Sequence, residues 1–89
     1  MTEISFSSSF KRSFKRKIAG HAEKVEKFWR VVEIFRHDPF HSSLKTHKLS
    51  GKMKHLLSFS VEYDLRVIFY FSDDNTARFV DIGTHDEVY

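Results

Sequence analysis

One set of five residues in the second half of the chain combines side chains that can transfer protons with a side chain that can hold an anion. They are His47, Asp64, Arg66, His85 and Tyr89. Imidazole titrates near neutral pH, so a histidine can act as a general base or a general acid. Arg66 lies in the apolar run 64–71, where an unpaired charge is costly, and it therefore requires a carboxylate or a bound phosphate. Taken singly, each residue also fits a structural role, such as a surface histidine, a turn aspartate or an internal ion pair.

One reaction that such a set can perform is the cleavage of RNA by its own 2′-hydroxyl. That reaction needs a base for the 2′-hydroxyl, positive charge at the phosphorane and an acid for the departing 5′-oxygen. His47 or Asp64 can be the base, and His85 can be the acid. Arg66 can hold the phosphate. Tyr89 can stack on a base or orient the substrate.

Two segments are rich in positive charge. Residues 11–17, KRSFKRK, place basic side chains along the outer face of an expected helix. Residues 45–55, KTHKLSGKMKH, contain no acidic residue, and Lys48, Lys52 and Lys54 are candidate phosphate contacts. A solvated helix face and a flexible basic loop are the alternatives, because both are common in proteins.

The sequence predicts no metal site and no cofactor. The chain lacks cysteine, so thiolate ligands and disulfides are excluded. His37 and His41 are four residues apart, but Pro39 between them argues against one helix face.

Apolar spacing predicts one domain, residues 1–89, of the α+β class in the order β-α-α-β-β-β. We expect an antiparallel sheet with a helical hairpin on one face and a freer second face. The expected strands are 3–7, 56–62, 64–71 and 76–83, with a brief strand near 47–49. One helix begins at the serines of 7–9 and ends near Gly20, and a second starts at residue 22 and ends before Pro39.

The charge of the chain is unevenly distributed. Residues 1–61 hold thirteen Lys and Arg against five Asp and Glu, whereas residues 62–89 hold two against seven. A basic portion of this kind favours a polyanionic partner. There is no long apolar stretch and no signal-peptide pattern, so we expect a cytoplasmic protein without a membrane partner.

The element order, the segment HKLSGKMKHLLSFSVEYDLRVIFYF (47–71) and the ending IGTHDEVY (82–89) together resemble the RelE/ParE toxin superfamily. The similarity is greatest to its YafQ-like mRNA interferases. It implies a small toxin, an endoribonuclease that cleaves mRNA on the ribosome without a metal. It also implies a separate cognate antitoxin, with operator DNA contacted only through that antitoxin.

The resemblance also implies the site. His47 matches the histidine of the H-x-L-x-G motif, and Asp64 matches the acid that opens the central strand. His85 matches the histidine of the terminal G-T-H, and Tyr89 matches the aromatic residue four positions later. Arg66 is similar to the strand arginine of RelE, which contacts the phosphate.

Two positions differ from the YafQ pattern, and two further interpretations remain open. Ser60 stands where YafQ has a histidine, and Leu65 stands where it has a tryptophan. One alternative is therefore an inactive relative. The other is a ParE-like inhibitor of DNA gyrase that acts by binding, although ParE-type chains generally lack the histidines and the acid.

Overall fold

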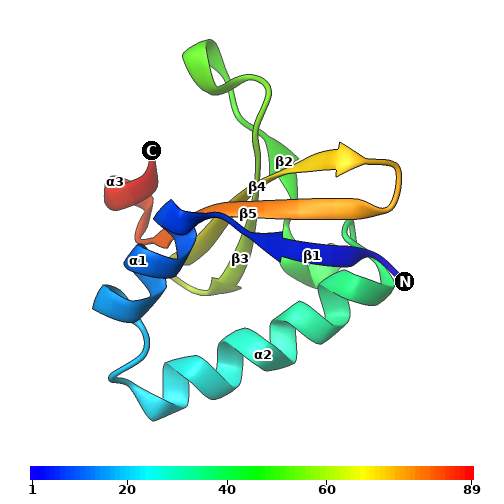
Figure 1. The fold of residues 1–89 in the computed structure, drawn as a ribbon. Coiled ribbons are helices and arrows are strands. Elements are labelled where there is room, and N and C mark those ends of the chain that lie inside the picture. Colours follow the sequence, from blue (N-terminus) through cyan, green and yellow to red (C-terminus); the bar gives the residue numbers. More distant parts are fainter.

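The structure, a computed structural model, describes residues 1–89 and places helices and strands close to the predicted positions (Figure 1). The helices are α1 (Ser8–Lys17), α2 (Ala22–His37) and α3 (His85–Val88). The strands are β1 (Glu3–Phe6), β2 (His47–Lys48), β3 (Leu57–Glu62), β4 (Leu65–Asp73) and β5 (Thr76–Gly83). Short 3-10 turns occupy Ser42–Leu44 and Gly51–Met53. None of the helices combines the length and the apolar character needed to cross a membrane.

The five strands form one mixed sheet in the order β1-β5-β4-β3-β2. The prediction of a wholly antiparallel sheet was wrong at one pair, because β1 runs parallel to β5. Tight turns force β3, β4 and β5 to alternate in direction, as expected. The long connection after β1, through both helices, imposes no such constraint, so the sequence alone did not determine the direction of β1.

Phenylalanines fill the core between α2 and the sheet. The centroid of the Phe35 ring of α2 lies 4.8 Å from the ring centroid of Phe59 of β3, 5.0 Å from that of Phe69 of β4 and 5.4 Å from that of Phe79 of β5. All four side chains are fully buried. Replacing a buried phenylalanine by alanine typically costs about 3–5 kcal/mol, so Phe35 is a principal anchor of the sheet on α2.

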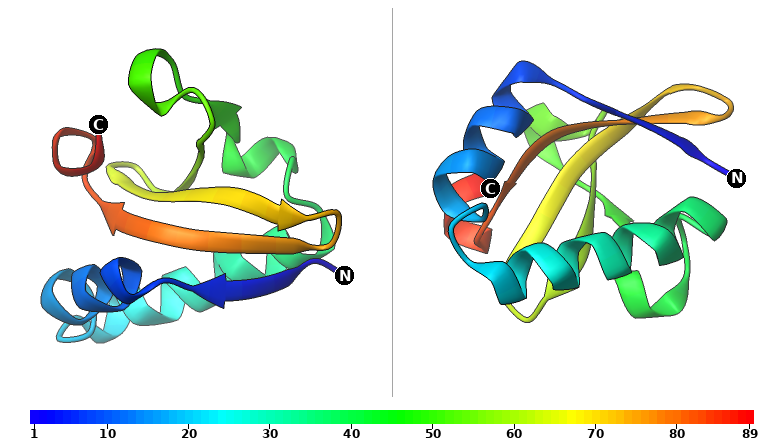
Figure 2. Two further views of the ribbon diagram at one scale, coloured as in Figure 1. Left: turned by 45° about the horizontal axis from the view of Figure 1, so that its top comes forward. Right: turned by 60° about the horizontal axis from the view of Figure 1, so that its bottom comes forward.

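α1 begins and α2 ends where their sequences predict, but α1 ends at Lys17 with Ile18 as its C-cap, before the predicted Gly20. The Ser7 hydroxyl caps α1 by accepting the N–H of Phe10 at 3.0 Å. A short turn leads into α2, and the two helices then diverge into a V instead of lying side by side along their lengths (Figures 1 and 2). The two helices are in contact through Phe28 of α2, whose ring centroid lies 5.9 Å from that of Phe10 and 5.0 Å from that of Phe14.

The sheet face opposite α2, hereafter the open face, carries the polar residues of the central strands. Side chains alternate along a strand, so Ser58 and Ser60 of β3 point away from the Phe59 core, as does Arg66 of β4, which pairs with Ser60. The edge-on view shows α3 and the chain after β2 on this side, with α1 and α2 on the other (Figure 2, left). The predicted freer face is therefore present, but α3 was not predicted.

Candidate functional site

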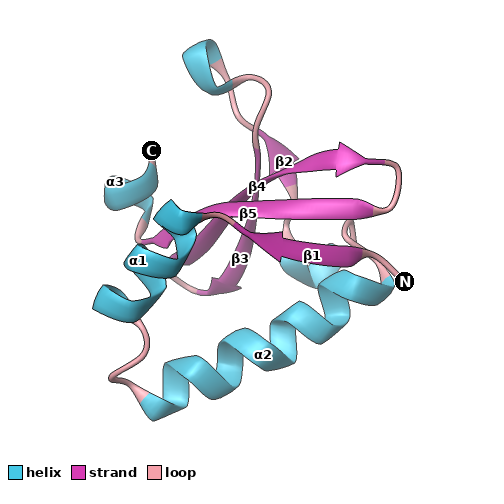
Figure 3. Ribbon diagram, viewed as in Figure 1, coloured by secondary structure: helices cyan, strands magenta, loops and turns pink.

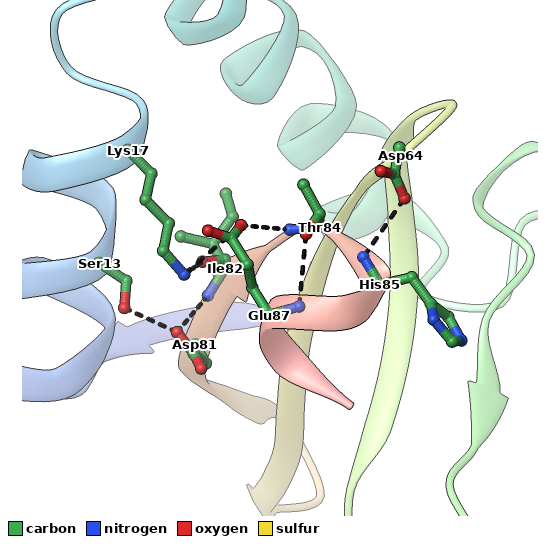
Figure 4. Close-up of polar contacts among 8 residues, drawn as sticks. All are labelled: Ser13, Lys17, Asp64, Asp81, Ile82, Thr84, His85 and Glu87. Atoms are coloured by element: carbon green, nitrogen blue, oxygen red, sulfur yellow. Dashed lines mark hydrogen bonds and ion pairs between the residues drawn. The ribbon is translucent and has the colours of Figure 1, made fainter.

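The last residues of the chain form a helix that carries two predicted site residues, His85 and Tyr89. Thr84 caps α3 in both directions: its hydroxyl accepts the N–H of Glu87, and its own N–H donates to the Glu87 carboxylate at 2.8 Å (Figure 4). The His85 ring stands edge-on to the Tyr89 ring with 4.4 Å between centroids. The structure thus brings these two side chains together.

Asp64 lies in the turn between β3 and β4 and contacts the start of α3. Its carboxylate accepts the backbone N–H of His85 at 3.3 Å, while the imidazole of His85 points away from it (Figure 4). Asp64 therefore lies beside His85, as predicted, but its contact is with the backbone and not with the ring. This geometry suits an anchor for α3 better than a general base.

His47 of β2 and Tyr89 line one shallow pocket of about 340 Å³ together with Lys48, Leu49, Ser50 and Met53. The Tyr89 hydroxyl donates to the hydroxyl of the fully buried Ser58. In the sheet register His47 is paired with the same Ser58, so the side chains of His47 and Ser58 lie on one face of the sheet. His47 and Tyr89 therefore both belong to the open face.

The tautomer of His47 follows from its hydrogen bond. Nδ1 lies 3.0 Å from the carbonyl oxygen of Lys45, and a carbonyl can only accept. Nδ1 must therefore carry the proton, which leaves the lone pair of Nε2 available in the neutral ring. A histidine in this state can act as a general base.

Arg66 lies half-buried beside the second pocket of the open face. Its guanidinium donates to the Ser60 hydroxyl at 2.7 Å and takes part in none of the ion pairs of the structure. Ser43 and Lys45 line this pocket of about 250 Å³ with Arg66. Of the two anions expected for Arg66, an internal carboxylate is not found: Glu62 lines the same pocket but forms no ion pair with it. The positive charge of Arg66 is therefore available to an anion from outside.

The other predicted phosphate contacts lie in the basic loop, residues 45–55. Lys48 lines the His47 pocket, whereas Lys52 and Lys54 are exposed and do not line it. His47 and Lys48 of this segment form β2, and the residues after them, with the 3-10 turn Gly51–Met53, project beyond the sheet (Figure 3). None of the three lysines forms an ion pair, so their charges face solvent.

One carboxylate next to the site has a perturbed acidity. The Thr84 N–H lowers the pKa of Glu87, the nearby Lys17 ammonium lowers it further, and partial burial opposes both effects. No cluster of three or more His, Cys, Asp or Glu side chains suitable for a metal ion occurs in the structure.

Sequence reasoning missed four residues around the site. Ser58 supports Tyr89, Lys45 adds charge beside Arg66, and Lys17 and Glu87 flank α3. Only Glu87 had a local signal, because the T-x-x-E pattern at 84–87 is a capping box. The others depend on contacts between distant parts of the chain.

Comparison with known families decides the identity of the fold. A sequence model described as a bacterial toxin of type II toxin-antitoxin system, YafQ, matches residues 2–89. The chain belongs to the YafQ family of toxins. Curated protein sequences gave no match.

Solved structures of other toxins share the fold of this YafQ-family chain. A metal-bound toxin from Helicobacter pylori superimposes with a TM-score of 0.80 at 23% identity, with 100% of each chain covered. YafQ from Escherichia coli BL21(DE3) gives 0.78 at 23% identity, covering 100% of this chain and 99% of that one. The toxin in the E. coli DinJ-YafQ toxin-antitoxin complex gives 0.77 at 24%, covering 99% and 97%. At these identities the likeness concerns the fold alone.

Proposed function

We propose that this YafQ-family toxin is an endoribonuclease that cleaves mRNA on the ribosome by general acid–base catalysis without a metal. The observation that carries the proposal is the arrangement on the open face. His47 and Tyr89 line one pocket, and His85 packs against Tyr89. Arg66 lines a separate pocket of the open face. Two imidazoles, an unpaired arginine and exposed lysines are the groups that cleavage by the 2′-hydroxyl requires.

His47 takes the proton of the 2′-hydroxyl in this proposal. Its Nδ1–H is engaged by the Lys45 carbonyl, so Nε2 is the basic atom. The 2′-oxygen then attacks the adjacent phosphorus, and the bond to the 5′-oxygen breaks. The alternative base, Asp64, is less suitable because its carboxylate already accepts the His85 backbone N–H.

His85 donates the proton that the departing 5′-oxygen needs. When protonated, its ring can pair with Asp86, whose carboxylate oxygen lies 3.5 Å from Nδ1. Arg66 and Lys48 hold the phosphate, since neither has an internal anionic partner. Tyr89 provides an aromatic ring next to the pocket for a nucleobase.

The partners follow from the same proposal. The substrate is mRNA in the ribosome, and a cognate antitoxin protein silences the toxin in the cytoplasm. The E. coli YafQ structure with DinJ supports an antitoxin, because that relative forms a toxin-antitoxin complex. Operator DNA is contacted through the antitoxin.

The test is RNA 5′-end mapping after brief induction in growing cells. Wild type, His85→Ala and a control, His21→Ala, are compared; His21 is exposed and its side chain makes no capping hydrogen bond. We expect new 5′ ends within translated codons for wild type and His21→Ala only. Growth arrest with intact mRNA would reject the proposal and favour gyrase inhibition. Neither arrest nor cleavage would indicate an inactive relative, in line with Ser60 and Leu65.

A further inference from the structure

Lys17 differs from the other basic residues of α1. Lys11, Arg12, Lys15 and Arg16 are exposed, whereas only 16% of the Lys17 side chain is accessible. Its ammonium donates to the Ile82 carbonyl at 3.2 Å and lies 3.7 Å from the Glu87 carboxylate (Figure 4). Lys17 therefore faces the protein and cannot serve as a freely exposed phosphate contact.

The Glu87 carboxylate joins this contact to the start of α3. The same oxygen that lies near Lys17, Oε1, accepts the N–H of Thr84. The packing there is tight: a Cβ added to Gly83 would lie 2.7 Å from the Lys17 nitrogen and 2.9 Å from Glu87 Oε1. A methyl group at position 83 would force the flexible ends of both side chains to shift.

α1 itself is fixed to β5 by a second polar contact. The Ser13 hydroxyl donates to the Asp81 carboxylate at 2.7 Å, and that carboxylate also accepts the Ile82 N–H at 2.8 Å. Asp81 lies at the irregularity in the β4–β5 pairing. The end of α1 is thus a firm support next to the last residues of β5.

α3 needs such a support because it has only four residues. A helix this short is unstable by itself in water. The site depends on its position, since its first residue is His85 and Tyr89 follows directly after it. On the other side α3 is held only by Asp64, by the buried Val88 and by the contact of Tyr89 with Ser58.

We propose that Lys17 and Glu87 are positioning residues, a latch from α1 to α3 that holds His85 and Tyr89 at the pocket lined by His47. The catalytic consequence rests on the proposed function, whereas the latch itself is a matter of geometry. A misplacement of about 1 Å can reduce a rate roughly 100-fold, so a latch remote from the substrate can still control turnover.

The experiment compares Lys17→Met, Glu87→Gln and Gly83→Ala with the matched controls Lys24→Met and Glu23→Gln. Both control residues are exposed in the first turn of α2. The first readout is the NMR shift of the His85 ring protons, which the edge-on Tyr89 ring displaces. We expect this displacement to be lost in the three latch variants, retained in both controls and restored in Lys17→Arg.

The second readout is cleavage of mRNA on purified ribosomes. The latch variants should lose about 10- to 100-fold in kcat with little change in KM, because misplacement affects turnover and not phosphate binding. Unaltered His85 shifts in Lys17→Met and Glu87→Gln would overturn the latch, whatever the activity. If the latch variants lose the displaced His85 ring-proton shift but the wild type cleaves no RNA, the latch is supported. The proposed function is then overturned instead.

Discussion

The candidate site is built from two regions that are held in place very differently. α3 is fixed on several sides, by its capping box, by Lys17, by Asp64 and by Ser58. The basic loop projects from the sheet, and its lysines make no ion pairs. We infer that preorganised groups, His85 on α3 and His47 on β2, transfer protons, and that the free charges of the projecting loop capture the phosphate backbone.

The largest effect should come from the residues that transfer protons. We expect His85→Ala and His47→Ala each to reduce kcat for mRNA cleavage about 10²- to 10⁴-fold, the usual contribution of a general acid or base. Single-turnover cleavage on ribosomes with saturating toxin measures this. If these substitutions mainly raised KM, the two histidines would be substrate-binding residues like the loop lysines. That result would contradict the proposed division between proton transfer and phosphate binding.

Substitutions at Asp64 distinguish a residue that anchors α3 from a general base. Asp64→Asn keeps an oxygen that can accept the His85 N–H, so an anchor should lose no more than about tenfold in kcat, the value of one hydrogen bond. Asp64→Ala removes the hydrogen-bond acceptor, so we expect a larger loss of kcat in this variant than in Asp64→Asn. If Asp64→Asn alone were as defective as His47→Ala, Asp64 would be the base.

The loop lysines should change binding more than turnover. Removing the charges of Lys48, Lys52 and Lys54 should raise KM and leave kcat nearly unchanged. The slope of log affinity against log salt for single-stranded RNA should fall by roughly 0.7 for each lysine that contacts a phosphate. Fluorescence-anisotropy titrations at several salt concentrations provide the slope, and an unchanged slope would contradict the role of the loop.

The smallest expected effect is the loss of the contact between Lys17 and Glu87 at acid pH. The pKa of Glu87 is lowered from 4.5 in the folded protein, so its stabilising contacts are complete above that value and are lost as the pH falls through the lowered pKa. We expect the displaced His85 ring shift of the wild type to be lost in that acidic range. Asp64→Asn keeps an oxygen that can accept the His85 N–H and should show the same step, because the step belongs to Glu87 and not to Asp64.

Much of the fold could be predicted from local patterns. The Ser7 cap, Pro39 after α2 and the alternating strands each act through neighbouring residues, and the structure confirms them. The direction of β1 could not be predicted, because it depends on pairing with β5 at the other end of the chain. The pattern for α3 was present in Thr84 and Glu87, but four residues are too few for a helical period.

The residues proposed for the site could be named from the sequence, but their arrangement could not. Sequence reasoning named His47, His85 and Tyr89, and the structure places them around one region of the open face. It did not separate the functions of Asp64 and His47, because the contact of Asp64 with a backbone N–H arises only when α3 forms. Lys17 was grouped with the exposed basic face for the same reason, since its partners lie on β5 and α3.

The most direct test of the account is the chemistry of the cut RNA. A ribosome-bound mRNA is incubated with the toxin, after the toxin alone has been dialysed against EDTA, and the ends of the products are identified. A second mRNA carries a single 2′-deoxyribose at the cleavage position. The account predicts a 2′,3′-cyclic phosphate on the upstream fragment and no cleavage at the deoxyribose. Cleavage that persists at the deoxyribose, or leaves a 3′-hydroxyl, would contradict it.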